Sequence, residues 1–320
     1  MQVYKVQKNQ NIYDVALYLF GSIEGIFELM ANNPELSYDT ELKEGDELYW
    51  DEQTIIHQSI VNEFYTTHIV PANATRNIYY KSTDAELRCY IQIPNNSVSL
   101  TLHVSGDHSM IVDWGDNTPL ETITLQSDVQ QYIHYFDNVV SERYIRLYGD
   151  FNLKTWNVSS INGLIMPTMP LVVDEFISQK NKISLQGLFL FKGTYSVILS
   201  GMDIESLTPI QDMSLSYLQL TDNKYTDESC IDAYLIYLAT HNNQRRNCKI
   251  VLDVQPSGTY GEPPKDEHGN YIITTGMQAI YVILHEPAWN EAGPWVFDIK
   301  GIEYAADNLT FNYTLSLIME

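Results

Sequence analysis

The 320-residue chain has few basic side chains. It contains 18 Lys and Arg against 41 Asp and Glu, so the formal net charge is 18 − 41 = −23. A nucleic-acid-binding surface needs clustered Lys and Arg to neutralise phosphates, and the one dense basic pair here is Arg245-Arg246. The composition therefore excludes nucleic acid as a partner and disfavours an anionic membrane surface.

Cysteine and long apolar runs are also scarce. The three cysteines, Cys89, Cys230 and Cys248, form no CxxC motif, so we expect reduced thiols and neither a disulfide framework nor a zinc site. No run of about 18 apolar residues occurs, which excludes a membrane-spanning helix. The first ten residues lack the apolar stretch of a secretory signal. We therefore expect a protein that is made in the cytoplasm and leaves it only by lysis or a dedicated machine.

Length and hydrophobicity predict several folded domains. At about 150 residues per domain the chain holds two or three, and 44% hydrophobic residues are enough for a core in each. The residue pattern changes in 53–92 and again near 160. The fold class we expect is a multidomain α+β protein with four segments. We expect a small βααβ domain over 1–52, a linker with extended strands over 53–92, a β-sandwich over 93–160 and a repeat-built α/β domain over 161–320.

The first segment predicts the order strand, helix, helix, strand. Residues 3–6 alternate as a short strand does, and apolar residues at helical spacing follow over 12–20. Asn11 is placed to cap this helix, and Gly21 is placed to end it, because glycine adopts positive φ at little cost. A second helical pattern covers 23–30 and precedes a closing strand.

This segment resembles a LysM domain. The residues that carry the resemblance are Tyr4, Val6, Asn9, Asn11, Ile12, Val15, Ala16, Phe20, Gly21, Ile26, Asn32, Pro34, Leu42, Gly45, Asp46 and Leu48. Asn9 replaces the glycine that is usual in the family, and asparagine also tolerates a left-handed turn.

LysM domains bind N-acetylglucosamine polymers in a shallow groove between two loops. The resemblance places the groove residues at Asn9, Gln10, Asn11, Ile12, Asn32, Asn33 and Pro34. The alternative is that the same surface docks on another protein. Residues 1–52 contain 11 acidic and 3 basic side chains, a net charge of 3 − 11 = −8, and this charge favours docking.

The third segment predicts an all-β domain. Short strands recur at intervals typical of a β-sandwich, over 97–104, 110–118, 121–125, 131–136 and 143–148. The turn Trp114-Gly115-Asp116-Asn117, followed by His134-x-Phe136, resembles a PKD-type immunoglobulin-like domain. Trp114 is expected to fill the core, Gly115 to permit the tight turn, and Asp116 and Asn117 to bond its backbone.

Asp113, Asp116 and His134 raise a second interpretation of this turn. Two carboxylates and an imidazole close together could hold a metal ion or act as an acid–base pair. Aspartate in a tight turn more often bonds the local backbone, so we expect the turn-stabilising role.

The last segment predicts a solenoid. The residues Leu215, Leu218, Leu220 and Asn223 fit the leucine-rich-repeat pattern L-x-x-L-x-L-x-x-N. Steps of 21 residues back lead to Val197, Leu199 and Met202, and then to Phe176, Ser178 and Asn181. We expect the two asparagines to bond backbone groups in the turns. The remaining predicted elements are a helix over 226–240, a strand over 249–254, a long loop over 256–270, a helix over 275–285, a strand over 295–299 and an edge strand over 309–317.

No catalytic signature is present: HExxH, GxSxG, Walker A and GxGxxG motifs are all missing. We expect a protein without enzymatic activity, cofactor or metal.

The three modules together resemble phage tail proteins, which implies a structural protein of a phage tail or baseplate, assembled in the host cytoplasm and located in the virion. Its expected partners are other tail proteins, further copies of itself within a particle, and a peptidoglycan or host-surface glycan. The alternative is a bacterial envelope protein that binds peptidoglycan through LysM and adheres through the other modules.

Overall fold

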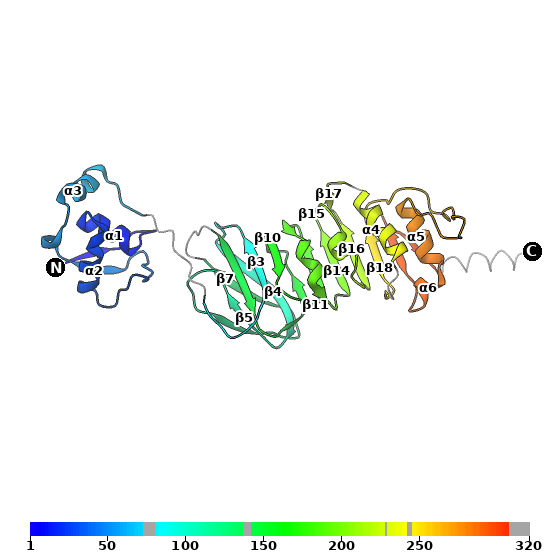
Figure 1. Ribbon diagram of the computed structural model, residues 1–320, viewed down its shortest axis with the longest axis horizontal. Coiled ribbons are helices and arrows are strands. Elements are labelled where there is room, and N and C mark those ends of the chain that lie inside the picture. The colour runs from blue at the N-terminus through cyan, green and yellow to red at the C-terminus, as the bar shows by residue number, and fades with distance from the viewer. Residues whose placement is uncertain (73–80, 137–141, 228, 242–244, 307–320) are drawn as a thin grey trace, which may run out of the picture. The chain divides into compact units, whose positions relative to one another are not determined.

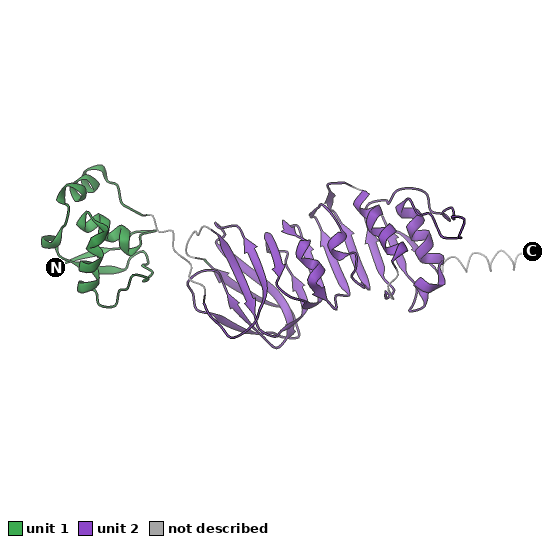
Figure 2. Ribbon diagram, in the orientation of Figure 1, with its two compact units in different colours: residues 1–79, 136–141 green, residues 80–135, 142–320 purple. Residues whose placement is uncertain are grey.

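The computed structural model describes residues 1–72, 81–136, 142–227, 229–241 and 245–306, and these form a mixed α/β protein rich in strands (Figure 1). The chain divides into two compact units (Figure 2). Unit 1 comprises residues 1–79 and 136–141, and unit 2 comprises residues 80–135 and 142–320. No helix among the described residues is long and apolar enough to cross a membrane.

Unit 1 begins with the elements that the sequence predicts, in the predicted order. They are strand β1 (Gln2–Lys5), helix α1 (Ile12–Phe20), 3-10 helix η1 (Ile23–Gly25), helix α2 (Ile26–Asn32) and strand β2 (Glu47–Trp50). Strands β1 and β2 pair antiparallel. Asn11 and Asp14 form a capping box at the start of α1, because each side chain accepts the other's backbone N–H. Gly21 ends α1 at a φ of 74°.

One apolar core holds these elements together. Its largest members are Phe20 and Trp50, whose rings meet edge to face with centroids 5.9 Å apart. The other buried members come from the segment between β1 and α1, from both helices, from the loop between α2 and β2 and from β2. They are Val6, Ile12, Val15, Ala16, Leu19, Ile26, Leu29, Leu36, Leu42 and Leu48.

A helix replaces the extended segment expected after residue 52. The 3-10 helix η2 (Glu52–Thr54) leads into helix α3 (Gln58–Thr67). Val61 is buried, and the ring centroids of Phe64 and Tyr65 lie 6.1 and 5.3 Å from that of Tyr18 on α1. The prediction of a strand here is wrong because β-branched and aromatic residues favour strands only where a strand partner exists. In this chain the partner is the side of α1.

The predicted sandwich strands of unit 2 are divided between two sheets. The first sheet has six strands in the order β12-β10-β3-β8-β5-β6. The bounds are β3 (Leu87–Ile93), β5 (Ser109–Asp113), β6 (Glu121–Thr124), β8 (Arg143–Tyr148), β10 (Gly163–Pro167) and β12 (Ile183–Ser184). Alternate residues of β3 and β8 are fully buried on one face, among them Ile91 and Ile145.

The second sheet contains the other predicted sandwich strands and the later strands as far as the end of the described chain. Its order is β20-β19-β18-β16-β14-β11-β9-β4-β7, with β13 paired to β11. The bounds are β4 (Ser99–Asp107), β7 (Gln130–Tyr135), β9 (Asn152–Asn157), β11 (Leu171–Gln179), β13 (Phe191–Lys192), β14 (Ser196–Ser200), β16 (Tyr217–Thr221), β18 (Lys249–Leu252), β19 (Val296–Ile299) and β20 (Ile302–Ala305). Figure 1 shows β11, β14, β16 and β18 side by side.

Six parallel strands of this sheet stack in register. The positions 21 residues apart, Phe176, Val197 and Leu218, are direct partners, as the repeat predicts. The same row extends to Trp156 before them and to Ile250 and Phe297 after them. All six side chains are completely buried. They form one continuous apolar row, which accounts for the stacking of the strands.

The remaining elements of unit 2 connect or cover the strands. The short strands β15 (Asp203–Ile204) and β17 (Lys224–Tyr225) pair in parallel. The helices are η3 (Gln186–Leu190), η4 (Thr208–Ile210), α4 (Ser229–Thr240), α5 (Gly276–His285) and α6 (Pro287–Asn290). The helix and strand predicted at 275–285 and 295–299 correspond to α5 and β19. The strand predicted at 309–317 lies outside the described residues.

No break in the sheet accompanies the change of pattern near residue 160. Strand β9 precedes this point and β11 follows it, and the two pair in parallel. Strand β10 also follows it, yet β10 pairs with β3 of the six-stranded sheet. The strands of the expected sandwich and of the expected repeat therefore belong to the same sheets.

Candidate functional site

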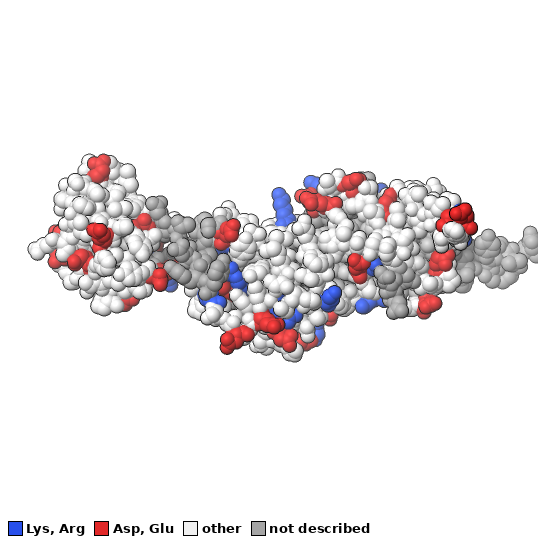
Figure 3. All heavy atoms as spheres, in the orientation of Figure 1, with Lys and Arg blue, Asp and Glu red and all other residues white. Residues whose placement is uncertain are grey.

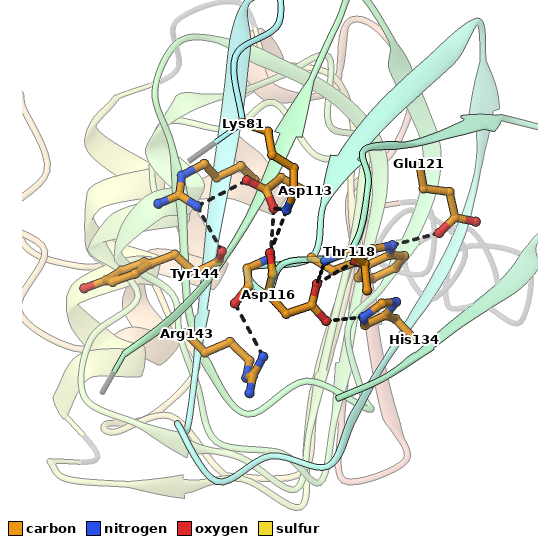
Figure 4. A network of polar contacts seen from close by, with 11 residues as sticks. Lys81, Asp113, Asp116, Thr118, Glu121, His134, Arg143 and Tyr144 are labelled. Atoms are coloured by element: carbon orange, nitrogen blue, oxygen red, sulfur yellow. Dashed lines mark hydrogen bonds and ion pairs between the residues drawn. The ribbon is translucent and has the colours of Figure 1, made fainter. Parts of the chain in front are cut away.

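The turn after β5 gathers buried charged side chains. Asp113 is completely buried, and its Oδ1 lies 2.9 Å from Nζ of Lys81 (Figure 4). Its Oδ2 lies 3.6 Å from Nη1 of Arg146 on β8. The backbone N–H of Gly115 also donates to Oδ1, at 3.1 Å. Asp113 thus joins the turn to two cations from distant parts of unit 2.

Asp116 serves the same turn through different partners. Its Oδ1 accepts hydrogen bonds from the backbone N–H and the hydroxyl of Thr118, at 2.9 and 2.5 Å, and its Oδ2 lies 2.6 Å from Nε2 of His134. Burial raises the pKa of this carboxyl, but the hydrogen bonds from His134 and Thr118 outweigh burial and lower the pKa to about 2. Asp116 is therefore ionised at neutral pH.

The lowered pKa predicts a loss of stability in acid. The folded value of about 2 lies below the ordinary 3.8, so this stabilisation is complete above pH 4 and disappears as the pH falls from about 4 to 2. The difference corresponds to about 2 kcal/mol. Urea unfolding of the wild type and of Asp116→Asn, followed by tryptophan fluorescence at several pH values, measures it. The wild type should lose more stability than the variant across this window, and equal losses would contradict the prediction.

Trp114 and Gly115 occupy the places that the sequence predicts. Trp114 is buried, its ring stacks on His134 with centroids 4.7 Å apart, and its Nε1 donates to Glu121 at 2.7 Å. Gly115 has a φ of 69°, and a Cβ there would lie 2.3 Å from the carbonyl oxygen of Tyr144. Only glycine fits this approach. The carbonyl of Gly115 accepts a 3.4 Å bond from Arg143, a fully buried arginine.

These contacts fit a bracing role better than a metal or acid–base role. The carboxylates of Asp113 and Asp116 point to different partners, and His134 is stacked on Trp114 while it bonds Asp116. Within the described residues, no group of three or more His, Cys, Asp or Glu side chains is arranged to hold a metal ion. Asn117 lies in the same turn and is itself engaged in a polar or ring contact.

Most residues of the first loop of the predicted LysM groove make contacts within unit 1. Asn9 is exposed and has a φ of 62°, the left-handed turn that the sequence predicts. Gln10 is buried: its Oε1 accepts from the Tyr4 hydroxyl at 2.8 Å, and its Nε2 donates to the carbonyl of Pro71 at 3.0 Å. Asn11 caps α1 and Ile12 belongs to the core.

The second loop of the groove shows the same division. Asn33 is buried, and its side chain both accepts from the N–H of Tyr49 and donates to the carbonyl of Tyr49, each at 2.8 Å. This pair of bonds ties the end of α2 to β2. Asn32 is half-buried and donates to Glu28 of its own helix, whereas Pro34 is exposed. Asn9 and Pro34 are thus the exposed members of the predicted groove.

The repeat residues lie in the interior of the stack. Leu215, Leu218 and Leu220 are buried. The side-chain Nδ2 of Asn223 donates to the carbonyl of Leu199 at 2.9 Å, and its Oδ1 accepts from the N–H of Met202 at 2.9 Å. Asn181 likewise donates to two backbone carbonyls, those of Val158 and Ile161. Both asparagines therefore satisfy backbone groups of the preceding turn, as the sequence predicts.

The three cysteines are free thiols. Cys89 and Cys248 are buried, and burial raises the pKa of both, that of Cys248 to about 12. Burial also raises the pKa of the half-buried Cys230. All three are protonated at neutral pH, and a protonated thiol is a poor nucleophile and metal ligand.

No protein-family model matches this chain, and no curated protein or solved structure matches it. The functional assignment therefore depends on the residues and contacts of the chain itself.

Proposed function

We propose that this chain is a non-enzymatic structural protein of a phage tail or baseplate. In this proposal unit 1 is a LysM-like docking domain, and unit 2 is a PKD-like and leucine-rich-repeat-like adaptor that faces a receptor. The observation that carries it is the sheet that runs without interruption from β7 to β20. Such a sheet is suited to a rigid adaptor, because pairing continues across the change of pattern near residue 160.

The polar residues of unit 2 support a structural role. Asp113, Asp116 and His134 brace one turn, and Asn181 and Asn223 close turns of the stack. Buried residues held in such contacts stabilise a scaffold, whereas catalytic groups must be able to reach a substrate.

Docking is the preferred role of unit 1. Gln10 and Asn33, two amides of the predicted groove, are buried and bonded within the unit. Acidic side chains are spread over the visible face of unit 1 (Figure 3). A docking partner should therefore present a basic or cation-bridged surface, and assembly should weaken as salt screens these charges.

Labelling of particles tests the assignment to a tail. Antibodies raised against the purified full chain should label the tails of particles released from the producing culture, in immunogold electron microscopy. Labelling confined to cell-wall fragments would refute the assignment and favour the envelope alternative. Preimmune serum provides the control.

Sedimentation with insoluble peptidoglycan tests docking against glycan binding. We expect the full chain to remain in the supernatant, because the amides of Gln10 and Asn33 in the predicted groove are engaged internally. Retention that is lost in Asn9→Ala and Pro34→Ala would contradict this prediction, since both residues are exposed. Asn33→Ala is unsuitable as a probe because it removes the bonds to Tyr49 and would disturb the fold.

A further inference from the structure

A cavity that is open to solvent lies over one face of the six-stranded sheet. Its volume is about 500 Å³, within the range of ligand-binding pockets. Its lining comes from β3, β8 and β10, and consists of Leu87, Tyr90, Tyr144, Arg146, Tyr148 and Met166.

Strand register explains why these side chains meet. Tyr144, Arg146 and Tyr148 alternate along β8, so they share one face, while Ile145 and Leu147 are buried on the other. Tyr90 on β3 is the direct partner of Arg146. The alternation along β8 is visible in the sequence. The sequence does not show that β3 and β10 lie beside β8, and the cavity exists only because these strands complete it.

The three tyrosines give the cavity apolar surface together with hydroxyl groups. The rings of Tyr90 and Tyr144 are nearly perpendicular, at 78°, with centroids 6.4 Å apart. The guanidinium carbon of Arg146 lies 5.6 Å from the centroid of Tyr90. Tyr90, Tyr144 and Tyr148 are each half-buried and line the cavity, so part of each residue is accessible to a ligand.

A peptide strand could not be added at this face. Strand β3 lies between β10 and β8, and β8 lies between β3 and β5. Their backbone groups are used in the ladders, so a ligand here must be recognised by side chains alone. Tyrosine rings pack on the C–H face of a pyranose ring, and tyrosine hydroxyls both donate to and accept from sugar hydroxyls.

The charge of the cavity selects among sugars. Arg146 is the charged residue among those that line the cavity, and the cluster beside it holds two cations, Lys81 and Arg146, against Asp113. A guanidinium is well suited to binding a carboxylate. We propose that this cavity binds a saccharide that carries a carboxylate, with Tyr90 and Tyr144 against the sugar ring and Arg146 directed to the carboxylate.

Binding assays with the purified full chain test this proposal. The probe is a tetrasaccharide of alternating glucuronate and N-acetylglucosamine, and the neutral comparison is the N-acetylglucosamine tetramer. Calorimetry should show binding of the acidic tetrasaccharide that weakens with salt. Tyr90→Ala and Tyr144→Ala should each raise its Kd roughly tenfold or more. Tyr135→Ala, at an exposed tyrosine on β7, provides the matched control and should leave the Kd unchanged.

Several outcomes would overturn the proposal. The first is that the acidic tetrasaccharide does not bind, and the second is that its binding survives both tyrosine substitutions. The others are that the neutral tetramer binds equally well at this site, or that a proline-rich peptide displaces the bound tetrasaccharide. Unchanged tryptophan fluorescence and urea midpoint show that each variant is folded. Tyr90→Phe, which keeps the ring, should retain more affinity than Tyr90→Ala.

This inference goes beyond the proposed structural role in a phage tail and does not depend on it. Sugar binding is measured on the isolated protein, whereas the tail assignment is measured on particles. A failure of one would therefore not be mistaken for a failure of the other.

Discussion

Replacement of Asp113 by Asn should destabilise unit 2 by about 3 kcal/mol, because it leaves two cations without their shared anion. The carboxylate of Asp113 is completely buried, and the side chain of Arg146 is only 8% exposed. Lys81 is 20% exposed and can recover part of its hydration, which places the loss toward the lower end of the range for broken buried ion pairs.

Urea unfolding followed by tryptophan fluorescence measures this loss. Four of the five tryptophans belong to unit 2, so the signal reports mainly on that unit. The matched control is Asp150→Asn. Asp150 also pairs with an arginine, Arg88, at 3.4 Å, but its side chain is 94% exposed, and we expect no measurable loss. Equal effects of the two substitutions would show that Asp113 does not brace the turn.

Truncation of Leu218 to Ala should cost unit 2 about 3 kcal/mol as well. Leu218 is completely buried in the apolar row, between Val197 on β14 and Ile250 on β18. Loss of the side chain removes buried apolar surface and leaves a cavity that the flanking strands cannot close without moving. Because each strand of a stack is supported by its neighbours, the damage should extend to β14 and β18.

Hydrogen exchange distinguishes this local effect from a uniform one. In Leu218→Ala, amides of β14, β16 and β18 should exchange faster, while amides of β3 and β8 keep most of their protection. Val98→Ala is the control, since Val98 is 75% exposed and its truncation should be nearly neutral. A stability of Leu218→Ala within 0.5 kcal/mol of wild type, roughly the range of surface substitutions, would contradict the role of the row.

The features predicted well are those encoded over a few neighbouring residues. The cap at Asn11, the end of α1 at Gly21 and the left-handed turn at Asn9 each depend on local backbone geometry. The 21-residue step correctly pairs Phe176 with Val197 and Val197 with Leu218, because a regular repeat converts a sequence interval into a strand spacing.

The features that were missed depend on long-range contacts. The sequence pattern favours an extended segment where α3 forms, and the contact of α3 with α1 explains why the segment is helical. The resemblance to LysM places Gln10 and Asn33 in a groove, yet they bond Pro71 and Tyr49, which lie 61 and 16 residues away. An amide side chain has the same appearance in a sequence whether it meets a ligand or a distant backbone group.

The amino-acid sequence by itself determined the mixture of helices and strands, the acidic character of the chain, the caps and turns, and the repeat of the stack. Tertiary structure alone decided the partners. It placed Lys81 and Arg146 beside Asp113, joined β9 to β11 across residue 160, and assembled the tyrosine-lined cavity from three strands. The physical reason is that capping and periodicity involve residues a few positions apart. Ion pairs, sheet order and cavities instead depend on which distant segments the buried apolar surface brings together.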